Sequence, residues 1–95
     1  MGRRLLETEE RLEQALFQDV PSRLAALLLQ LRTDMGSNDV ELTHEQLAEH
    51  LGVYRETVTA ALNSLRKEDL VSIGRKHVHL INLPELERKA FGKSG

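Results

Sequence analysis

The sequence THEQLAEHLGVYRETV, residues 43–58, carries the clearest structural signal in the chain. Its first four residues have the form of a capping box, in which the Thr43 hydroxyl and the Gln46 side chain each bond a free backbone N–H at a helix start. Gly52 can adopt the left-handed backbone conformation that ends a helix. The stretch therefore predicts two short helices joined by a tight turn, as in a helix-turn-helix.

The spacing inside this stretch favours a helix-turn-helix over an ordinary helical hairpin, which is the alternative. Ala48 lies four residues before Gly52, where a small side chain lets two helices cross closely. Val58 lies six residues after Gly52 and is expected to face the first helix. The second helix is predicted over residues 55–67. The inward positions of the pair are Leu47, Ala48, Leu51, Val58, Ala61, Leu62 and Leu65.

The residues before the motif predict another helix. Asp19 can cap its start, and Pro21 is tolerated in the first turn because its missing N–H has no helical partner. This helix is expected to end near Thr33, and residues 40–42 alternate as a very short strand would. Residues 1–18 carry only a thin stripe of leucines, so they predict the end of a longer helix that packs on a partner, or a helix lying on the domain.

The residues after the motif predict a hairpin and a short last helix. Two alternating runs, 70–73 and 77–81, flank the turn residues 74–76. A helix capped by Asn82 is expected to run to residue 91, before a flexible tail over residues 92–95. The predicted fold is mainly α with a small β-hairpin, a winged helix-turn-helix over residues 19–91. Its predicted core is Leu24, Leu27, Leu28, Leu31, Leu47, Leu51, Val58, Leu62, Leu65 and Leu70.

Composition limits the classes of protein that the chain can be. Ninety-five residues make one domain, and the absence of cysteine excludes disulfides, thiolate metal sites and cysteine nucleophiles within it. There is no apolar run of membrane-spanning length and no signal peptide, so we expect a cytoplasmic protein. The formal net charge of −2 gives a nucleic-acid binder no support from bulk charge. A DNA-binding face would have to arise from the placement of its cations.

The start of the second helix is the candidate base-reading surface, because this end of such a motif enters the major groove. Arg55 can hold guanine O6 and N7 as a bidentate pair, and Glu56 can accept from the amino group of cytosine. Thr59 follows one turn later as a third candidate base-reading residue. The alternative is that Arg55 and Glu56 form an exposed salt-bridge pair.

The predicted wing tip offers Arg75, Lys76 and His77, which suit a phosphate clamp. The alternative is a solvated turn whose charges keep the strand edges soluble. Thr43 and His44 are further candidate phosphate contacts, since the start of a helix favours anions. For Thr43, helix capping is the better supported role.

Residues 42–58 resemble the helix-turn-helix of the family of the cyclic-AMP receptor protein and the fumarate–nitrate regulator (CRP/FNR), most specifically over residues 52–58. The hairpin also resembles the wing of that family, and residues 19–25 resemble its junction between the dimerisation helix and the DNA-binding domain. The resemblance therefore covers residues 3 to 81. It implies a homodimer in the full-length protein, with residues 1–18 as the end of its dimerisation helix, and binding to a palindromic DNA operator. By position, Arg55 and Glu56 match its base-reading pair, and Thr43, His44 and Thr57 its phosphate contacts.

The chain also departs from the family pattern. Tyr54 stands where the family often has a Ser or Thr that caps the helix and contacts phosphate, which makes Tyr54 a candidate phosphate contact with a bulky ring. Ala60 stands where a second arginine is frequent, so the operator cannot be copied from the family. The family's sensory β-barrel is not in this sequence, and we expect no cofactor in this chain. RNA polymerase is a further candidate partner.

Two other functions compete with DNA binding as interpretations of the sequence. A winged helix can serve as a protein-interaction module without binding DNA, and the near-neutral charge favours that alternative. His77 and His79 lie two apart on a predicted strand and could begin a zinc site, but such a site needs three or four ligands. No carboxylate is obviously placed to complete it, and no nucleophile–base pair is evident. We therefore expect neither a metal site nor an enzyme.

Overall fold

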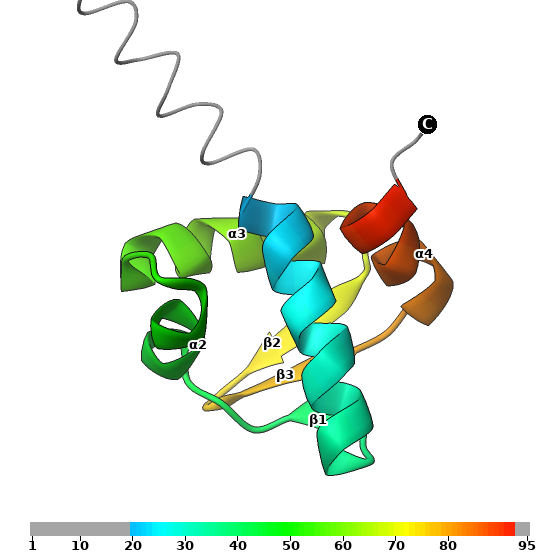
Figure 1. Cartoon of the computed structure of the whole chain (residues 1–95), viewed down its shortest axis with the longest axis horizontal. Coiled ribbons are helices and arrows are strands. Elements are labelled where there is room, and N and C mark those ends of the chain that lie inside the picture. Colours follow the sequence, from blue (N-terminus) through cyan, green and yellow to red (C-terminus); the bar gives the residue numbers. More distant parts are fainter. Residues whose placement is uncertain (1–19, 93–95) are drawn as a thin grey trace, which may run out of the picture.

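A computed structural model describes residues 20–92 (Figure 1). The predicted dimerisation helix (1–18) and nearly all of the predicted tail (92–95) lie outside the described residues. The winged helix-turn-helix fold is confirmed. The chain is helical over residues 20–35, called the leading helix below. It continues through β1 (Asp39–Val40), α2 (His44–Leu51), α3 (Arg55–Lys67), β2 (Val71–Gly74), β3 (His77–Leu80), α4 (Leu83–Glu87) and a π-helical segment η1 (Arg88–Gly92).

The predicted caps of α2 are present. The Thr43 hydroxyl accepts from the Gln46 N–H at 3.1 Å, and the Gln46 side-chain oxygen accepts from the Thr43 N–H at 2.9 Å. At the other end Gly52 has a φ of 73° and donates its N–H to the Ala48 carbonyl at 2.8 Å. Such a φ favours glycine, because residues with a Cβ adopt this left-handed region only with strain. The local sequence thus sets both ends of α2.

α3 has the predicted bounds and ends in a sharp reversal. Asp69 has a φ of 61°, and its N–H bonds the Arg66 carbonyl at 2.9 Å. The Leu70 N–H bonds the Leu65 carbonyl at 3.1 Å. These bonds satisfy carbonyls at the helix end. They turn the chain directly into β2, so the wing follows α3 without a long loop.

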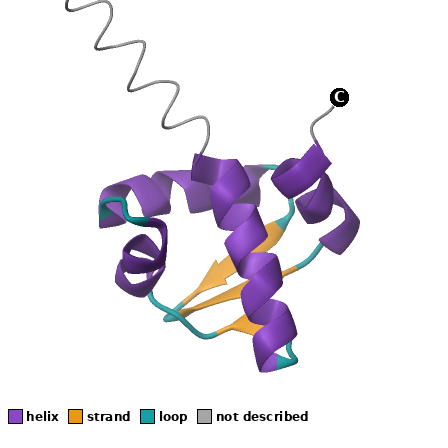
Figure 2. Cartoon of the chain, in the orientation of Figure 1, coloured by secondary structure: helices purple, strands orange, loops and turns teal. Residues whose placement is uncertain are grey.

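The sheet is antiparallel with strand order β1-β3-β2. Figure 2 shows the helices gathered around this small sheet. β2 and β3 pair up to Gly74 opposite His77, which leaves Arg75 and Lys76 as the wing turn. β1 comprises residues 39–40, so the strand predicted over residues 40–42 was placed too far along the chain. Its position follows from pairing with β3, where Asp39 lies opposite His79.

The core draws on the leading helix, both helices of the motif, all three strands and α4. Most of the predicted core is buried, but Leu27 and Leu31 are only partly buried. The leading helix contains leucines on more than one face, so its sequence does not reveal which leucines face inward. The strands and α4 supply buried residues that were not in the predicted core, namely Val40, Val71, Val78, Leu80 and Leu86.

The last helix is present with its predicted cap. The Asn82 side chain accepts from the Glu85 N–H at 3.3 Å, and Pro84 lies in the first turn. The α-helix ends at Glu87, and residues up to 92 continue as the π-helical η1.

Candidate nucleic-acid interface

The first turn of α3 presents two charged side chains to solvent. Arg55 and Glu56 are exposed, whereas Val58 and Ala61 on the other side of the helix are buried. Arg55 and Glu56 make no ion pair with each other among the contacts of residues 20–92. Because the opposite face is buried in the core, this face of α3 has a fixed orientation, and its two charged side chains remain open to solvent.

The N-cap of α3 is unusual. Tyr54 has the extended backbone of an N-cap, with φ −78° and ψ 154°, but its side chain makes no capping hydrogen bond. The residue is 81% exposed. The Tyr54 carbonyl accepts from the N–H groups of Thr57 and Val58, as expected at a helix start. α3 therefore begins without the side-chain cap that α2 has.

One contact joins α2 to α3 and brings two predicted site residues together. His44 Nδ1 lies 2.8 Å from the Thr59 hydroxyl oxygen. Both side chains are half-buried. Burial lowers the pKa of His44 below its ordinary value of 6.5, and the neighbouring Arg55 charge lowers it further. The neutral imidazole is therefore favoured here, and no sequence pattern had predicted the contact.

The wing turn lies across an open groove from the start of α2. The groove brings the predicted wing cations together with Thr43, but two carboxylates that the sequence analysis did not assign to the site line it as well. Its lining residues are Asp39, Glu41, Thr43, Gln46, Arg75, Lys76 and His77. The groove is therefore mixed in charge, and the exposed turn is its most cationic part.

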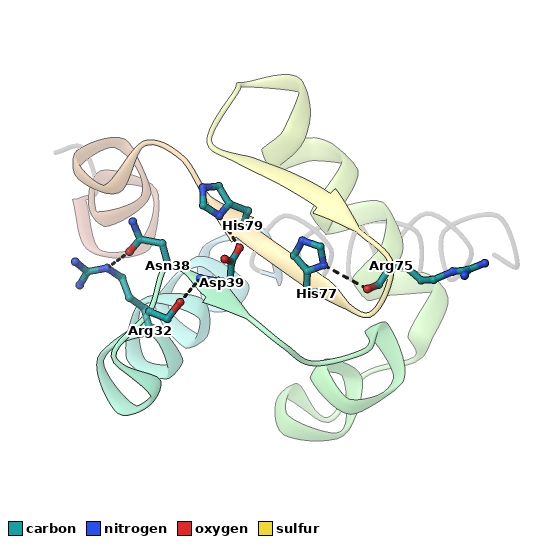
Figure 3. Close-up of polar contacts among 7 residues, drawn as sticks. Arg32, Asn38, Asp39, Arg75, His77 and His79 are labelled. Carbon is teal, nitrogen blue, oxygen red and sulfur yellow. Dashed lines mark hydrogen bonds and ion pairs between the residues drawn. The ribbon is translucent and has the colours of Figure 1, made fainter.

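The wing turn has a tight local structure. Lys76 has a φ of 61°, and His77 Nδ1 lies 3.3 Å from the Arg75 carbonyl oxygen. A Cβ added to Gly74 would collide with the His77 ring, so the ring lies against this glycine. The Arg75 side chain extends away from the His77 ring (Figure 3). Of the three predicted wing residues, Arg75 and Lys76 are exposed and His77 is half-buried.

His79 lies beside a carboxylate of the neighbouring strand. His79 Nδ1 lies 2.6 Å from Asp39 Oδ1 on the neighbouring strand, as Figure 3 shows. Within residues 20–92, no group of three or more potential ligands is arranged to hold a metal ion. The carboxylate beside His79 was not identified from the sequence, because strand pairing brings together residues 40 positions apart.

A hydrogen bond joins the leading helix to the helix-turn-helix. Arg23 Nη2 donates to the carbonyl of Leu51, the last residue of α2, at 2.7 Å. A cation at this end also complements the helix dipole. The site is thus fixed at the turn between α2 and α3 as well as through the core.

Comparison with known proteins gives a consistent result. Residues 22–89 match the model of the Crp-like helix-turn-helix domain. The chain is 35% identical over 89 residues to the global nitrogen regulator of Synechococcus elongatus, covering 86% of this chain and 40% of that protein. It is 33% identical over 97 residues to a CRP-like cAMP-activated global transcriptional regulator of Mycobacterium tuberculosis, covering 95% of this chain and 43% of that protein.

A solved structure of similar fold points to the same family. The catabolite activator protein of Thermus thermophilus superposes with a TM-score of 0.82 at 33% identity, covering 96% of this chain and 43% of that one. The chain thus spans about two fifths of the length of the relatives it matches. Within residues 20–92, no helix has the length and apolar character that crossing a membrane requires.

Proposed function

The chain belongs to the CRP/FNR family of transcription regulators, and we propose that it binds duplex DNA with α3 in the major groove and the wing on the phosphate backbone. As a member of this family it acts by sequence-specific DNA binding and not as an enzyme. The observation that carries the proposed geometry is the exposed pair Arg55 and Glu56 at the first turn of a helix whose opposite face is buried.

In this geometry Arg55 reads a guanine and Glu56 a neighbouring cytosine, with Thr59 one turn further along α3. Each good bidentate contact supplies about 1–3 kcal/mol of discrimination. Ala60 is exposed beside them and offers only a methyl group. The absence of a long side chain there supports an operator that differs from those of relatives with an arginine at this position.

We assign the main backbone contacts to Arg75 and Lys76. The carboxylates of Asp39 and Glu41 line the adjacent groove and would repel a phosphate that entered it. A phosphate is therefore best accommodated at the exposed turn. The remaining proposed phosphate contacts lie at the two helix starts and beside the turn, and they are Thr43, His44, Tyr54, Thr57 and His77.

The full-length protein is proposed to be a homodimer that binds a palindromic operator in the cytoplasm. A dimer would set the half-sites about one helical turn, or a multiple of it, apart. RNA polymerase is a candidate partner of the assembled regulator. Any effector would bind outside this chain, for which we propose no cofactor. The transcription-regulator relatives, of which this chain spans about two fifths, support this larger assembly.

The test is a salt titration of binding to random duplex DNA. We expect binding to weaken with salt, and Arg75→Ala/Lys76→Ala to reduce the salt slope by about 1–2, since each released phosphate contact contributes roughly 0.9. The matched control is Arg66→Ala/Lys67→Ala, which removes two exposed cations from the far end of α3. This control should leave the slope near the wild-type value.

An operator selection then tests base reading. Arg55→Ala should lose preference at one base position of each half-site while keeping its affinity for random DNA within a few-fold. If the wild type fails to bind at low salt, even when a fused coiled coil restores a dimer, DNA binding by this chain is refuted. The winged helix would then be a protein-interaction module.

A further inference from the structure

We propose that His44 is a specificity-determining residue, because its hydrogen bond to Thr59 fixes whether the Thr59 hydroxyl offers a proton or a lone pair to a base edge. The inference rests on the proposed function, in which α3 lies in the major groove. It goes further by naming the base chemistry that Thr59 reads. It also assigns that choice to a side chain on the other helix of the motif.

The geometry gives Thr59 a defined partner. His44 is the first residue of α2, and Thr59 lies in the second turn of α3. His44 Nδ1 is 2.8 Å from the Thr59 hydroxyl oxygen. Thr59 follows Arg55 by four residues, so the two share one side of the helix. The hydroxyl is therefore held beside the arginine that is proposed to read guanine.

A threonine hydroxyl has one proton and two lone pairs, and neutral histidine has one donor and one acceptor nitrogen. If the Thr59 hydroxyl donates to Nδ1, only its lone pairs remain for the DNA. It can then accept from an amino group of adenine or cytosine. If Nδ1–H donates instead, the hydroxyl proton is free for an acceptor such as guanine O6 or thymine O4, which stand where adenine and cytosine carry their amino groups.

The position of the ring selects between these states. Nδ1 faces Thr59, so Nε2 is the nitrogen left for a backbone phosphate. An anion requires a donor, so Nε2 must carry the proton, and in a neutral ring Nδ1 is then an acceptor. Burial and the Arg55 charge, which lower the pKa of His44, favour the neutral ring. Thr59 therefore presents lone pairs and reads adenine or cytosine.

The experiment begins with the full chain and a random duplex library. We expect the wild type to prefer adenine or cytosine at one half-site position on the strand that Thr59 faces. Thr59→Val keeps the branched shape without the hydroxyl and should reduce that preference roughly 3- to 10-fold, the effect of one hydrogen bond. His44→Phe should weaken the preference at the same position. The double variant should lose no more than Thr59→Val alone, since the two residues act through one bond.

Two further variants test whether the position of the hydrogen-bonding atom at residue 44, and not the size of the side chain, is what matters. In His44→Asn the amide lies two bonds from Cβ, as Nδ1 does, and we expect it to restore part of the preference. In His44→Gln the amide lies one bond further, and we expect no recovery. Thermal unfolding of every variant checks that the domain is intact, and the half-buried position of His44 predicts that each variant folds.

The outcomes are distinct. If the His44 variants bind all sequences more weakly by one common factor and leave the preference at the Thr59 position unchanged, the ring is only a phosphate contact, and the inference is overturned. A preference for guanine or thymine at the Thr59 position would reverse the assigned hydroxyl polarity and also overturn it. If the wild type enriches no sequence, the proposed function fails, and the inference fails with it.

Discussion

The uncapped start of α3 predicts that Tyr54→Ser stabilises the domain. Tyr54 already has an N-cap backbone, so a serine hydroxyl can bond a free N–H of the first turn without a change in backbone. Tyr54 is 81% exposed, and removal of its ring therefore costs little buried surface. We expect a gain of about 1 kcal/mol, which for a domain of this size is a Tm increase of ~4–8 °C.

The assay is urea unfolding followed by far-ultraviolet circular dichroism. Tyr54→Ala is the control, because it removes the ring without adding a cap and should leave stability nearly unchanged. Thr43→Ala provides the opposite test, since it removes the cap that α2 has and should cost about 1 kcal/mol. A Tyr54→Ser variant no more stable than Tyr54→Ala would refute the account of this helix start.

Three further predictions concern backbone conformation and pH. Gly52→Ala should destabilise the domain by about 1–2 kcal/mol in urea unfolding, because Gly52 has a φ near +70° that strains any residue with a Cβ. Gly36→Ala should cost a similar amount, since its φ is also near +70° and at neither position would the added Cβ meet an atom within 4 Å. Unequal costs would show that contacts beyond the backbone contribute. Asp69→Gly should raise the free energy of unfolding by about 1 kcal/mol, since Asp69 has a φ of 61° that glycine adopts without strain. An unchanged urea midpoint would show that the backbone at Asp69 is not strained. The pKa of His44 is lower in the fold than its ordinary 6.5, so the unfolded chain takes up the proton more readily. Its contribution to stability is complete above pH 6.5 and is lost as the pH falls through the folded-state pKa; His44→Gln should flatten that part of the pH profile, and an identical profile would oppose the prediction.

Features set by neighbouring residues could be predicted from the sequence. Thr43, Gln46 and Gly52 fix the ends of α2 through bonds within one or two turns, so the pattern of residue types was sufficient. The exposure of Arg55 and Glu56 followed from the helical period of the apolar residues behind them. The roles of these two residues in base reading remain predictions.

Features set by distant residues could not be predicted. β1 was misplaced because its bounds depend on pairing with β3, and Leu27 and Leu31 were assigned to the core because a leucine-rich helix does not show which face is covered. The contact between His44 and Thr59 depends on how two helices cross. No local pattern encodes such a crossing at the level of individual atoms.

The pairing of β1 with β3 has a consequence for how the domain is made. The two strands enclose α2 and α3 in one closed loop of chain, and β3 supplies the buried Val78 and Leu80. During synthesis from the N-terminus, both helices of the motif emerge from the ribosome before β3 does. The nascent helix-turn-helix therefore lacks part of its core until Leu80 has emerged.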